Sequence, residues 1–206
     1  RRASRADVAL FEQEAGPDGA QVGAVAVDST QEAMFDAGPP APSVDPADLA
    51  AIYAEPHDHC AWGYGHDIRV TQTIALAAWL ADMAPAADRI ADLSTGNGAI
   101  PIALVRPGRQ LVLGDYAPRW PIVGPLEDTL PHLEPVDLFI CSETIEHLDN
   151  PDAVLALIGE KAHRLILTTP LGETSDGNPE HYWGWDHDGI GSMLADTGWA
   201  ALAVNP

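Results

Sequence analysis

Acidic and imidazole side chains lie close together in the segment 142–147, which reads SETIEH. Glu143 and Glu146 are three residues apart and His147 follows directly, so one helical turn would project all three to one side. Downstream, His181 could return to the same place. Two carboxylates and two imidazoles with open positions would suit Mg²⁺, Mn²⁺ or Zn²⁺. Without a metal ion, Glu146 would cap a helix and His147 would pack or act as a general base.

A glycine-containing loop forms a second candidate site. The segment 94–98, which reads STGNG, follows one short apolar run, and Asp115 ends the next, seventeen residues after Gly98. Glycines let a backbone approach a ligand closely, and the amides that open a helix favour an anionic group. An acidic side chain in the position of Asp115 can accept both hydroxyls of a ribose. Together, the loop and this carboxylate predict a ligand that contains adenosine.

These candidate residues stand where short apolar runs end. The runs have the length and turn-rich borders of buried strands, and stretches with helical spacing alternate with them. The alternation predicts a doubly wound α/β fold, in which a mostly parallel sheet carries helices on both faces. Ligands bind in such sheets beyond the carboxyl ends of the strands. The predicted strands are 89–93, 110–114, 121–123, 136–141, 164–168 and 199–204, and the predicted helices are 68–83, 100–105, 151–160 and 189–197.

The first fifty residues differ in sequence pattern from the rest of the chain. We expect residues 1–50 to form an N-terminal extension, with one edge strand at 21–27 and a proline-rich linker at 38–42 (GPPAP). Residues 51–206 form the predicted main domain.

The charge balance is strongly acidic. The 206 residues include 31 acidic and 10 basic side chains, which gives a formal net charge of −21. This balance counts against a broad basic face for nucleic acid and against docking on an anionic membrane. No apolar run approaches the ~18 residues of a membrane span. We therefore expect a cytoplasmic protein that acts on a small molecule, with Cys60 and Cys141 as free thiols.

Three ordered motifs resemble one enzyme superfamily. The run 90–98 (IADLSTGNG) resembles the first motif of class I S-adenosylmethionine-dependent methyltransferases, usually written D-L-G-C-G-N-G. The run 136–148 (VDLFICSETIEHL) is similar to the fourth-strand motif of that superfamily, including its E-x-x-E-H-L ending. The run 165–170 (LILTTP) is similar to the fifth-strand motif. The resemblance implies a Rossmann-like methyltransferase fold for residues 51–206, with S-adenosylmethionine as cofactor.

The resemblance also implies roles for the residues of the first motif. Asp92, Gly96 and Gly98 would line the methionine and ribose part of the cofactor, and Asp115 would hold the ribose hydroxyls. Ser94 stands where the superfamily has its first glycine. A serine would crowd the cofactor there if the backbone required a positive φ.

Further roles follow for residues outside that motif. Glu127 or Asp128 would meet the adenine, and Ser142 with Glu143 would sit below the methyl group. Arg69, on the predicted helix before the first motif, could pair with the cofactor carboxylate in the bidentate way that arginine favours. The superfamily usually adds a seventh strand, for which the segment 21–27 could substitute.

The E-x-x-E-H pattern with a downstream histidine has a narrower resemblance. It is similar to the metal site of small-RNA 3′-terminal 2′-O-methyltransferases and to ubiquinone-biosynthesis O-methyltransferases. The implied ligands are Glu143, Glu146, His147 and His181. In those families the metal binds substrate hydroxyls and lowers a pKa.

The predicted function is methyl transfer from S-adenosylmethionine to an oxygen or nitrogen of a small molecule. His147, Glu143 or a bound metal would help to deprotonate the acceptor. Two alternatives stay open, a metal-dependent RNA 2′-O-methyltransferase and a non-catalytic cofactor-binding or scaffold module with the same fold. Histidine and aromatic clusters at 57–66 and 181–187 would form either a loop that closes over the acceptor or a hydrophobic plug.

Overall fold

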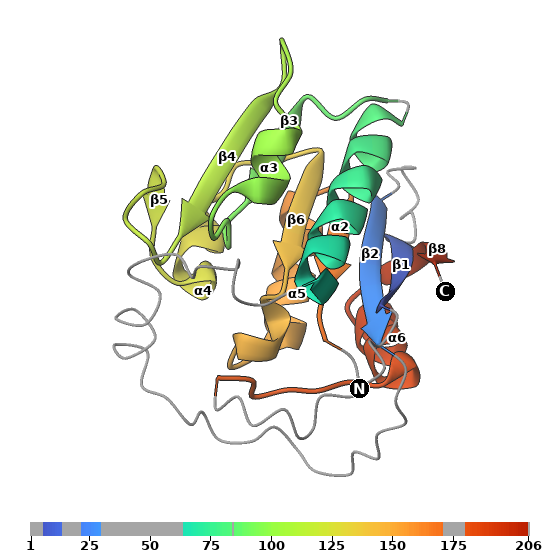
Figure 1. Ribbon diagram of the computed structural model, residues 1–206. Coiled ribbons are helices and arrows are strands. Elements are labelled where there is room, and N and C mark those ends of the chain that lie inside the picture. Colours follow the sequence, from blue (N-terminus) through green and yellow to red (C-terminus); the bar gives the residue numbers. More distant parts are fainter. Residues whose placement is uncertain (1–5, 14–21, 30–63, 84, 171–179, 206) are drawn as a thin grey trace.

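The computed structural model describes residues 6–13, 22–29, 64–83, 85–170 and 180–205. Its centre is a five-stranded sheet in which every pairing is parallel, in the order β5-β4-β3-β6-β7 (Figure 1). The strands are short and apolar, as predicted. They are β3 (Arg89–Asp92), β4 (Gln110–Asp115), β5 (Ile122–Val123), β6 (Leu138–Ser142) and β7 (Leu165–Thr168).

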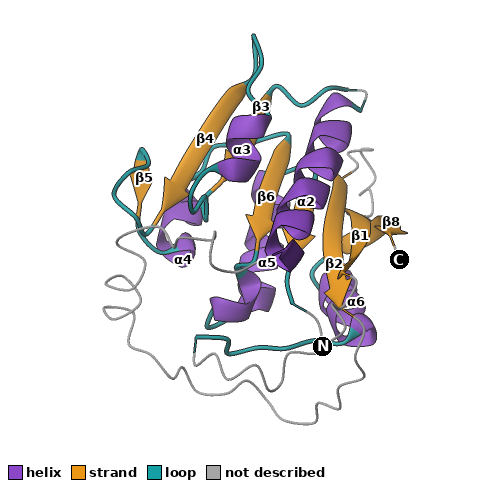
Figure 2. Ribbon diagram, viewed as in Figure 1, coloured by secondary structure: helices purple, strands orange, loops and turns teal. Residues whose placement is uncertain are grey.

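Helices cover both faces of this sheet (Figure 2). Successive strand residues point to opposite faces, so Leu138 and Ile140 pack in one core with α2, while Phe139 and Cys141 pack in the other with α5 and α6. This arrangement confirms the predicted doubly wound fold. The helices are α2 (Tyr64–Asp82), α3 (Ala99–Ala103), α4 (Leu126–Thr129), α5 (Pro151–Lys161) and α6 (His187–Asp196), with 3-10 turns η2 (Leu130–His132) and η3 (Ile145–His147).

Local signals explain where two of these helices begin and end. The side chain of Asn150 accepts a hydrogen bond of 3.0 Å from the amide of Ala153, and Pro151 occupies the first turn of α5, where proline is favoured. Arg164, which precedes β7, donates bonds of 2.9 Å to the carbonyl oxygens of Leu80 and Pro85 at the end of α2. These bonds fix α2 against the sheet.

A separate three-stranded antiparallel sheet joins the two ends of the described chain. Its order is β2-β1-β8, with β1 (Ala6–Gln13), β2 (Val22–Ser29) and β8 (Trp199–Asn205). The prediction that 21–27 substitutes for a seventh strand of the parallel sheet is wrong in its pairing: β2 lies beside β7, but its hydrogen-bonded partner is β1. The last predicted strand, 199–204, forms as β8 but likewise pairs with β1.

The strand β1 was missed altogether. Pro17-Asp18-Gly19, a typical turn sequence, lies between β1 and β2 and could have predicted the hairpin.

Several predictions lie outside the described residues. They concern the proline-rich stretch 38–42, Cys60 and most of the cluster 57–66. Cys141 is a buried free thiol, as expected. None of the helices in the described part of the chain is long and apolar enough to cross a membrane.

Candidate functional site

The glycine loop leaves the carboxyl end of β3 and enters α3. Gly96 and Gly98 have φ values of 53° and 86°, in the left-handed region that glycine adopts without strain. A Cβ atom on Gly98 would also come within 2.7 Å of the Trp120 ring and of the Ile102 side chain. Ser94 is not among the described residues with positive φ, so a serine fits at the place of the first glycine of the motif.

Side chains from both flanking strands hold this loop. Asp115, at the end of β4, accepts hydrogen bonds from the amides of Gly96 (2.6 Å) and Ala117 (3.0 Å). Asp92, at the end of β3, accepts a bond of 3.1 Å from the amide of Ser94. On the outer side, the indole of Trp120 donates a bond of 3.0 Å to the carbonyl oxygen of Gly96. The loop is therefore a preorganised structure.

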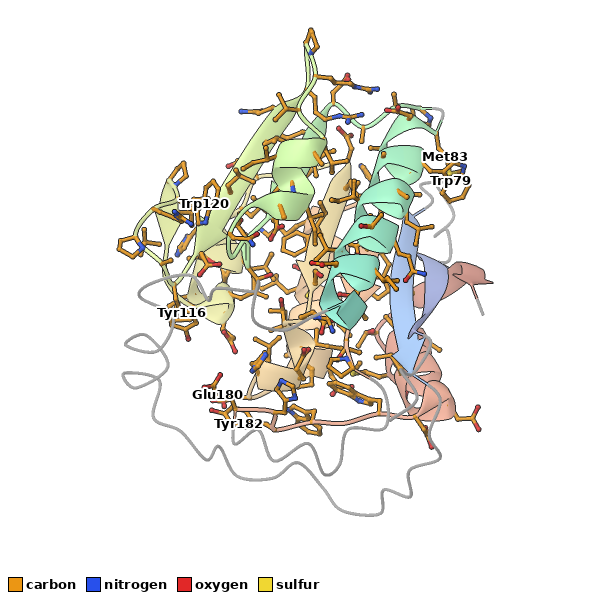
Figure 3. All side chains as sticks on the ribbon, in the orientation of Figure 1. Trp79, Met83, Tyr116, Trp120, Glu180 and Tyr182 are labelled. Carbon is orange, nitrogen blue, oxygen red and sulfur yellow. The ribbon has the colours of Figure 1, made fainter. Side chains whose placement is uncertain are left out.

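Trp120 is a residue that the sequence reasoning missed. It lies between β4 and β5, beyond the predicted acidic residue, and reaches back over the loop (Figure 3). An indole N–H usually needs a partner when it leaves water. Nothing in the sequence pattern indicates that this partner is Gly96.

Two carboxylates lie close together below the loop. The carboxyl of Asp92 is buried, and the loss of water together with the nearby negative charge of Asp115 raises its pKa to about 7. A ligand group that donates a hydrogen bond or carries a positive charge would relieve this repulsion. The site therefore suits hydroxyl and ammonium groups.

Acidic and tyrosyl groups surround the next part of the site. Glu127 and Asp128 are exposed on α4, and Tyr116 follows directly after Asp115. Glu127 is exposed as a whole residue, but its carboxyl loses part of its water contact. This desolvation, and then the charges of Asp149 and Asp128, raise the pKa of Glu127. Burial, and then the charges of Glu127, Asp128 and Asp149, raise the pKa of Tyr116 to about 12. The two residues predicted to meet the adenine, Glu127 and Asp128, are thus carboxylates close to the Tyr116 side chain.

The strand β6 ends in an unusual backbone turn. Glu143 has a φ of 52° and is the one residue other than glycine with positive φ in the described segments. Its amide donates to the carbonyl oxygen of Thr168 (2.8 Å) on β7, next to a bond of 2.7 Å between the hydroxyls of Ser142 and Thr168. The side chain of Glu143 forms an ion pair with Arg69 of α2, at 2.8 Å. Backbone strain of this kind collects at functional sites.

Three of the four predicted metal ligands come together. Glu146, His147 and His181 each offer a ligand atom, and these atoms lie within 4.8 Å of one another. Glu143 is not part of this group, because Glu146 and His147 lie on the short 3-10 turn η3 and Glu143 precedes that turn. The prediction that one helical turn projects Glu143 with its two neighbours is therefore wrong in its geometry.

Burial sets the protonation of this cluster. Glu146 is 1% exposed, and loss of water raises its pKa to about 7. One of its oxygens, Oε2, accepts a bond of 3.0 Å from the Thr169 hydroxyl, while Oε1 has no hydrogen-bond partner among the described residues. Burial, and then the charge of His181, lower the pKa of His147 to about 4, so this imidazole is neutral near pH 7.

The segment 180–185 lies against the 3-10 turn η3. Nδ1 of His147 lies 2.9 Å from the carbonyl oxygen of Glu180, so in the neutral ring Nδ1 is the donor and Nε2 carries the lone pair. Nε2 is 3.9 Å from Oε1 of Glu146. The Tyr182 amide donates to the Glu146 carbonyl oxygen (2.8 Å), and the Trp183 indole donates to that of Leu148 (2.7 Å).

The aromatic residues of this segment are largely internal. Tyr182 and Trp185 are buried, and the rings of Trp183 and Trp185 stack with centroids 6.1 Å apart. Figure 3 shows Tyr116, Glu180 and Tyr182 on the side of the molecule where the strands of the parallel sheet end. The aromatic residues of 182–185 therefore pack against η3 and the core, with Trp185 beside α6.

Comparison with known proteins adds evidence on the fold. No protein-family model matches the chain, and no curated protein matches its sequence. Among solved structures, the N-terminal domain of EvdMO1 with SAH bound has a TM-score of 0.51 and 16% identity, covering 75% of this chain and 87% of that one. The chain shares the Rossmann-like α/β fold of this domain. A second structure, of the same EvdMO1 domain in the presence of SAH and D-fucose, has a TM-score of 0.47 and 17% identity and covers 61% and 72% of the two chains.

Proposed function

We propose that this protein is an S-adenosylmethionine-dependent methyltransferase that acts on an oxygen or nitrogen of a small molecule. The observation that carries the proposal is the glycine loop held between two carboxylates at the carboxyl ends of β3 and β4. Asp115 binds two backbone amides through different oxygens, and each oxygen keeps a second lone pair for a ribose hydroxyl. The structural neighbour with SAH bound supports a cofactor of this class in this fold.

The remaining residues supply positioning and proton acceptance. Methyl transfer depends mainly on holding the nucleophile, the methyl carbon and the sulfur in line. Ser142 ends β6, the strand next to β3, and Glu143 follows it, where the methyl group is expected. The neutral His147 has a ring nitrogen that can accept a proton, but its pKa of about 4 makes it a weak base, so it suits an acceptor whose own pKa is lowered.

The cluster of Glu146, His147 and His181 favours a metal-assisted version of this reaction. The partnerless oxygen of Glu146 and the lone pair on Nε2 of His147 are the donors that Mn²⁺ or Zn²⁺ takes from proteins, and the carboxylate also suits Mg²⁺. A bound ion would hold an acceptor hydroxyl and lower its pKa. The carbonyl oxygen of Glu180 would orient the His147 ring, as partners outside a metal site commonly do.

A small acceptor agrees with the charge of the molecule better than RNA does. The chain has a net charge of −21, and the charges of Glu127, Asp128 and Asp149 act on Tyr116, the residue directly after Asp115. Phosphate groups would be repelled there. Binding of short RNA that weakens with salt would overturn this choice of acceptor.

Calorimetry with S-adenosylhomocysteine (SAH) tests the cofactor site. We expect micromolar binding by the native chain and at least tenfold weaker binding by Asp115→Asn, which keeps one acceptor oxygen but loses the charge. Asp152→Asn, an exposed position on α5, is the matched control and leaves the affinity unchanged. If SAH does not bind, or if Asp115→Asn behaves like the control, the cofactor assignment is wrong.

Methyl transfer itself separates an enzyme from a scaffold. Incubation with labelled S-adenosylmethionine and a panel of phenols, catechols and amines should label one class of acceptor. Loss of activity in chelator, with recovery on adding Mg²⁺, Mn²⁺ or Zn²⁺, supports the metal-assisted version. Cofactor binding without transfer to any acceptor supports the non-catalytic module.

A further inference from the structure

The arginine that faces the proposed cofactor site is already paired with a carboxylate of the protein. Nη1 of Arg69 lies 2.8 Å from Oε2 of Glu143, and both side chains are 22% exposed. The pair is thus shielded enough to be stable and open enough for a ligand to reach. A guanidinium binds an amino-acid carboxylate through the same contact that it makes with a glutamate.

Other basic residues beside the sheet form ion pairs or hydrogen bonds away from the proposed cofactor site. Arg106 and Arg109 bind Asp82, Arg164 binds carbonyl oxygens at the end of α2, and Lys161 binds the carbonyl oxygen of Pro131. All of these lie at the amino ends of the strands. Among the described residues, Arg69 and the exposed Arg119 are the arginines that lie toward the carboxyl ends.

The position of the pair matches the direction of the proposed ligand. The strands β4, β3 and β6 are neighbours, and their ends carry Asp115, Asp92 and Glu143 in that order. Adjacent strands are about 4.8 Å apart, so the pair lies roughly two spacings from Asp115. A ligand with its ribose on Asp115 that extends across β3 brings its amino-acid tail to Arg69.

The backbone of Glu143 is held by bonds that do not involve its side chain. Its amide is held by the carbonyl oxygen of Thr168 at 2.8 Å and by the Thr168 hydroxyl at 3.1 Å. These bonds keep the residue in its left-handed conformation at the end of β6. These backbone bonds do not involve the carboxylate, so the conformation of the strand end does not depend on the ion pair with Arg69.

We propose that Glu143 is an intramolecular competitor of the cofactor carboxylate for Arg69. A ligand that carries an α-carboxylate displaces Glu143, while an adenosine ligand without that group leaves the pair intact. This inference rests on the proposed function, because it requires the adenosine site. It assigns to the Arg69–Glu143 pair the control of affinity for the amino-acid half of the ligand.

Two ligands that differ only in that half test the proposal. SAH carries the amino-acid tail, and 5′-methylthioadenosine has the adenosine and the sulfur without it. Because Glu143→Gln removes the competing charge, it should tighten SAH about three- to fivefold, the upper part of the range expected for a partly exposed ion pair. Its affinity for 5′-methylthioadenosine should stay within twofold.

Further variants make the test specific. Arg69→Gln should weaken SAH about tenfold and leave 5′-methylthioadenosine within twofold. In the Arg69→Gln background, Glu143→Gln should have no further effect on SAH. Asp149→Asn, which removes an exposed carboxylate that does not touch Arg69, controls for the change in net charge. Glu143→Asn repeats the test with a residue that tolerates left-handed backbone and is too short to reach the arginine.

The outcomes separate the two proposals. If the native chain binds neither ligand, the proposed function fails and the competition fails with it. If both ligands bind but Glu143→Gln weakens SAH, or shifts both affinities equally, the competition alone is overturned. A tightening of SAH by Asp149→Asn as large as that by Glu143→Gln would reduce the effect to general electrostatics and overturn the competition as well.

Discussion

The two ends of the parallel sheet are built in different ways. At the amino ends, charges are matched: Arg109 donates to the carbonyl oxygens of Ala87 and Leu104 and pairs with Asp82. At the carboxyl ends, Asp92 is a buried carboxyl with a raised pKa, and Glu143 has a strained backbone. The polar groups at the amino ends stabilise the fold. The carboxyl ends instead keep polar groups without good partners, which a ligand could bind.

Removal of Arg109 should give the largest loss of stability. Its side chain is 3% exposed and ties α2, α3 and β4 together. Arg109→Ala leaves buried carbonyl oxygens without donors, and we expect unfolding free energy to fall by about 4 kcal/mol. Urea denaturation measures this loss. The SAH affinity of the folded fraction should not change, and a large change in it would break the division between the two ends.

The pH dependence of stability reports on the opposite end. The pKa of Asp92 is raised from 3.8 in the unfolded chain to about 7, so the folded state binds more protons between these values. Its contribution therefore opposes folding increasingly as pH rises from about 4 to 7. Asp92→Asn should remove this penalty and gain about 3 kcal/mol relative to the native chain across that window.

Urea denaturation at several pH values checks this prediction. Asp152→Asn, which removes an exposed carboxylate on α5, is the matched control. A difference between Asp92→Asn and the native chain that is constant with pH would contradict the raised pKa. The comparison with the native chain is needed because the lowered pKa of His147 acts in the other direction, favouring folding as pH rises from about 4 to 6.5.

Two glycines with nearly the same φ distinguish the effect of backbone conformation from the effect of side-chain contact. Gly98 and Gly108 have φ values of 86° and 87°, but a Cβ on Gly98 meets Trp120 and Ile102 at 2.7 Å, whereas one on Gly108 meets nothing within 4 Å. Gly108→Ala should cost about 1 kcal/mol and leave SAH binding unchanged. Gly98→Ala should cost about 2 kcal/mol and weaken SAH at least tenfold. Equal effects of the two on SAH would contradict a preorganised loop.

The smallest predicted effect belongs to Trp120. Trp120→Phe keeps the ring over Gly98 but loses the hydrogen bond to the carbonyl oxygen of Gly96. We expect a loss of about 1 kcal/mol in stability and three- to fivefold weaker SAH binding. Calorimetry detects this change. A KM for cofactor that rises while kcat stays constant would identify Trp120 as a positioning residue, and an unchanged KM would restrict it to a structural role.

The sequence was sufficient for elements whose signal is local. The buried runs of β6 and β7, the Asn150 cap and the proline in the first turn of α5 all follow from patterns within a few residues. The carboxyl-end position of Asp92 and Asp115 then followed from the rule for parallel sheets. The roles of these residues stay predictions until ligand binding is measured.

Long-range choices were beyond the same reasoning. The spacing of Glu143, Glu146 and His147 is compatible with an α-helix and with a 3-10 turn, and the ion pair with Arg69 spans 74 positions of the chain. The sequence predicted a strand at 21–27, and β2 forms there. The apolar pattern of a strand does not determine which other strand it pairs with. Trp120 likewise contacts a loop more than twenty residues before it.

The pairing of β1 with β8 has a mechanical consequence. Val8 stands opposite Asn205 and Gln13 opposite Trp199, so the outer ends of the two strands lie at the same end of the ladder. Tension applied between Ala6 and Asn205 therefore loads one residue pair at a time and unzips the strands, where a load spread across all pairs would shear them. Under force, β8 should peel away at low load before tension reaches the parallel sheet that carries the site.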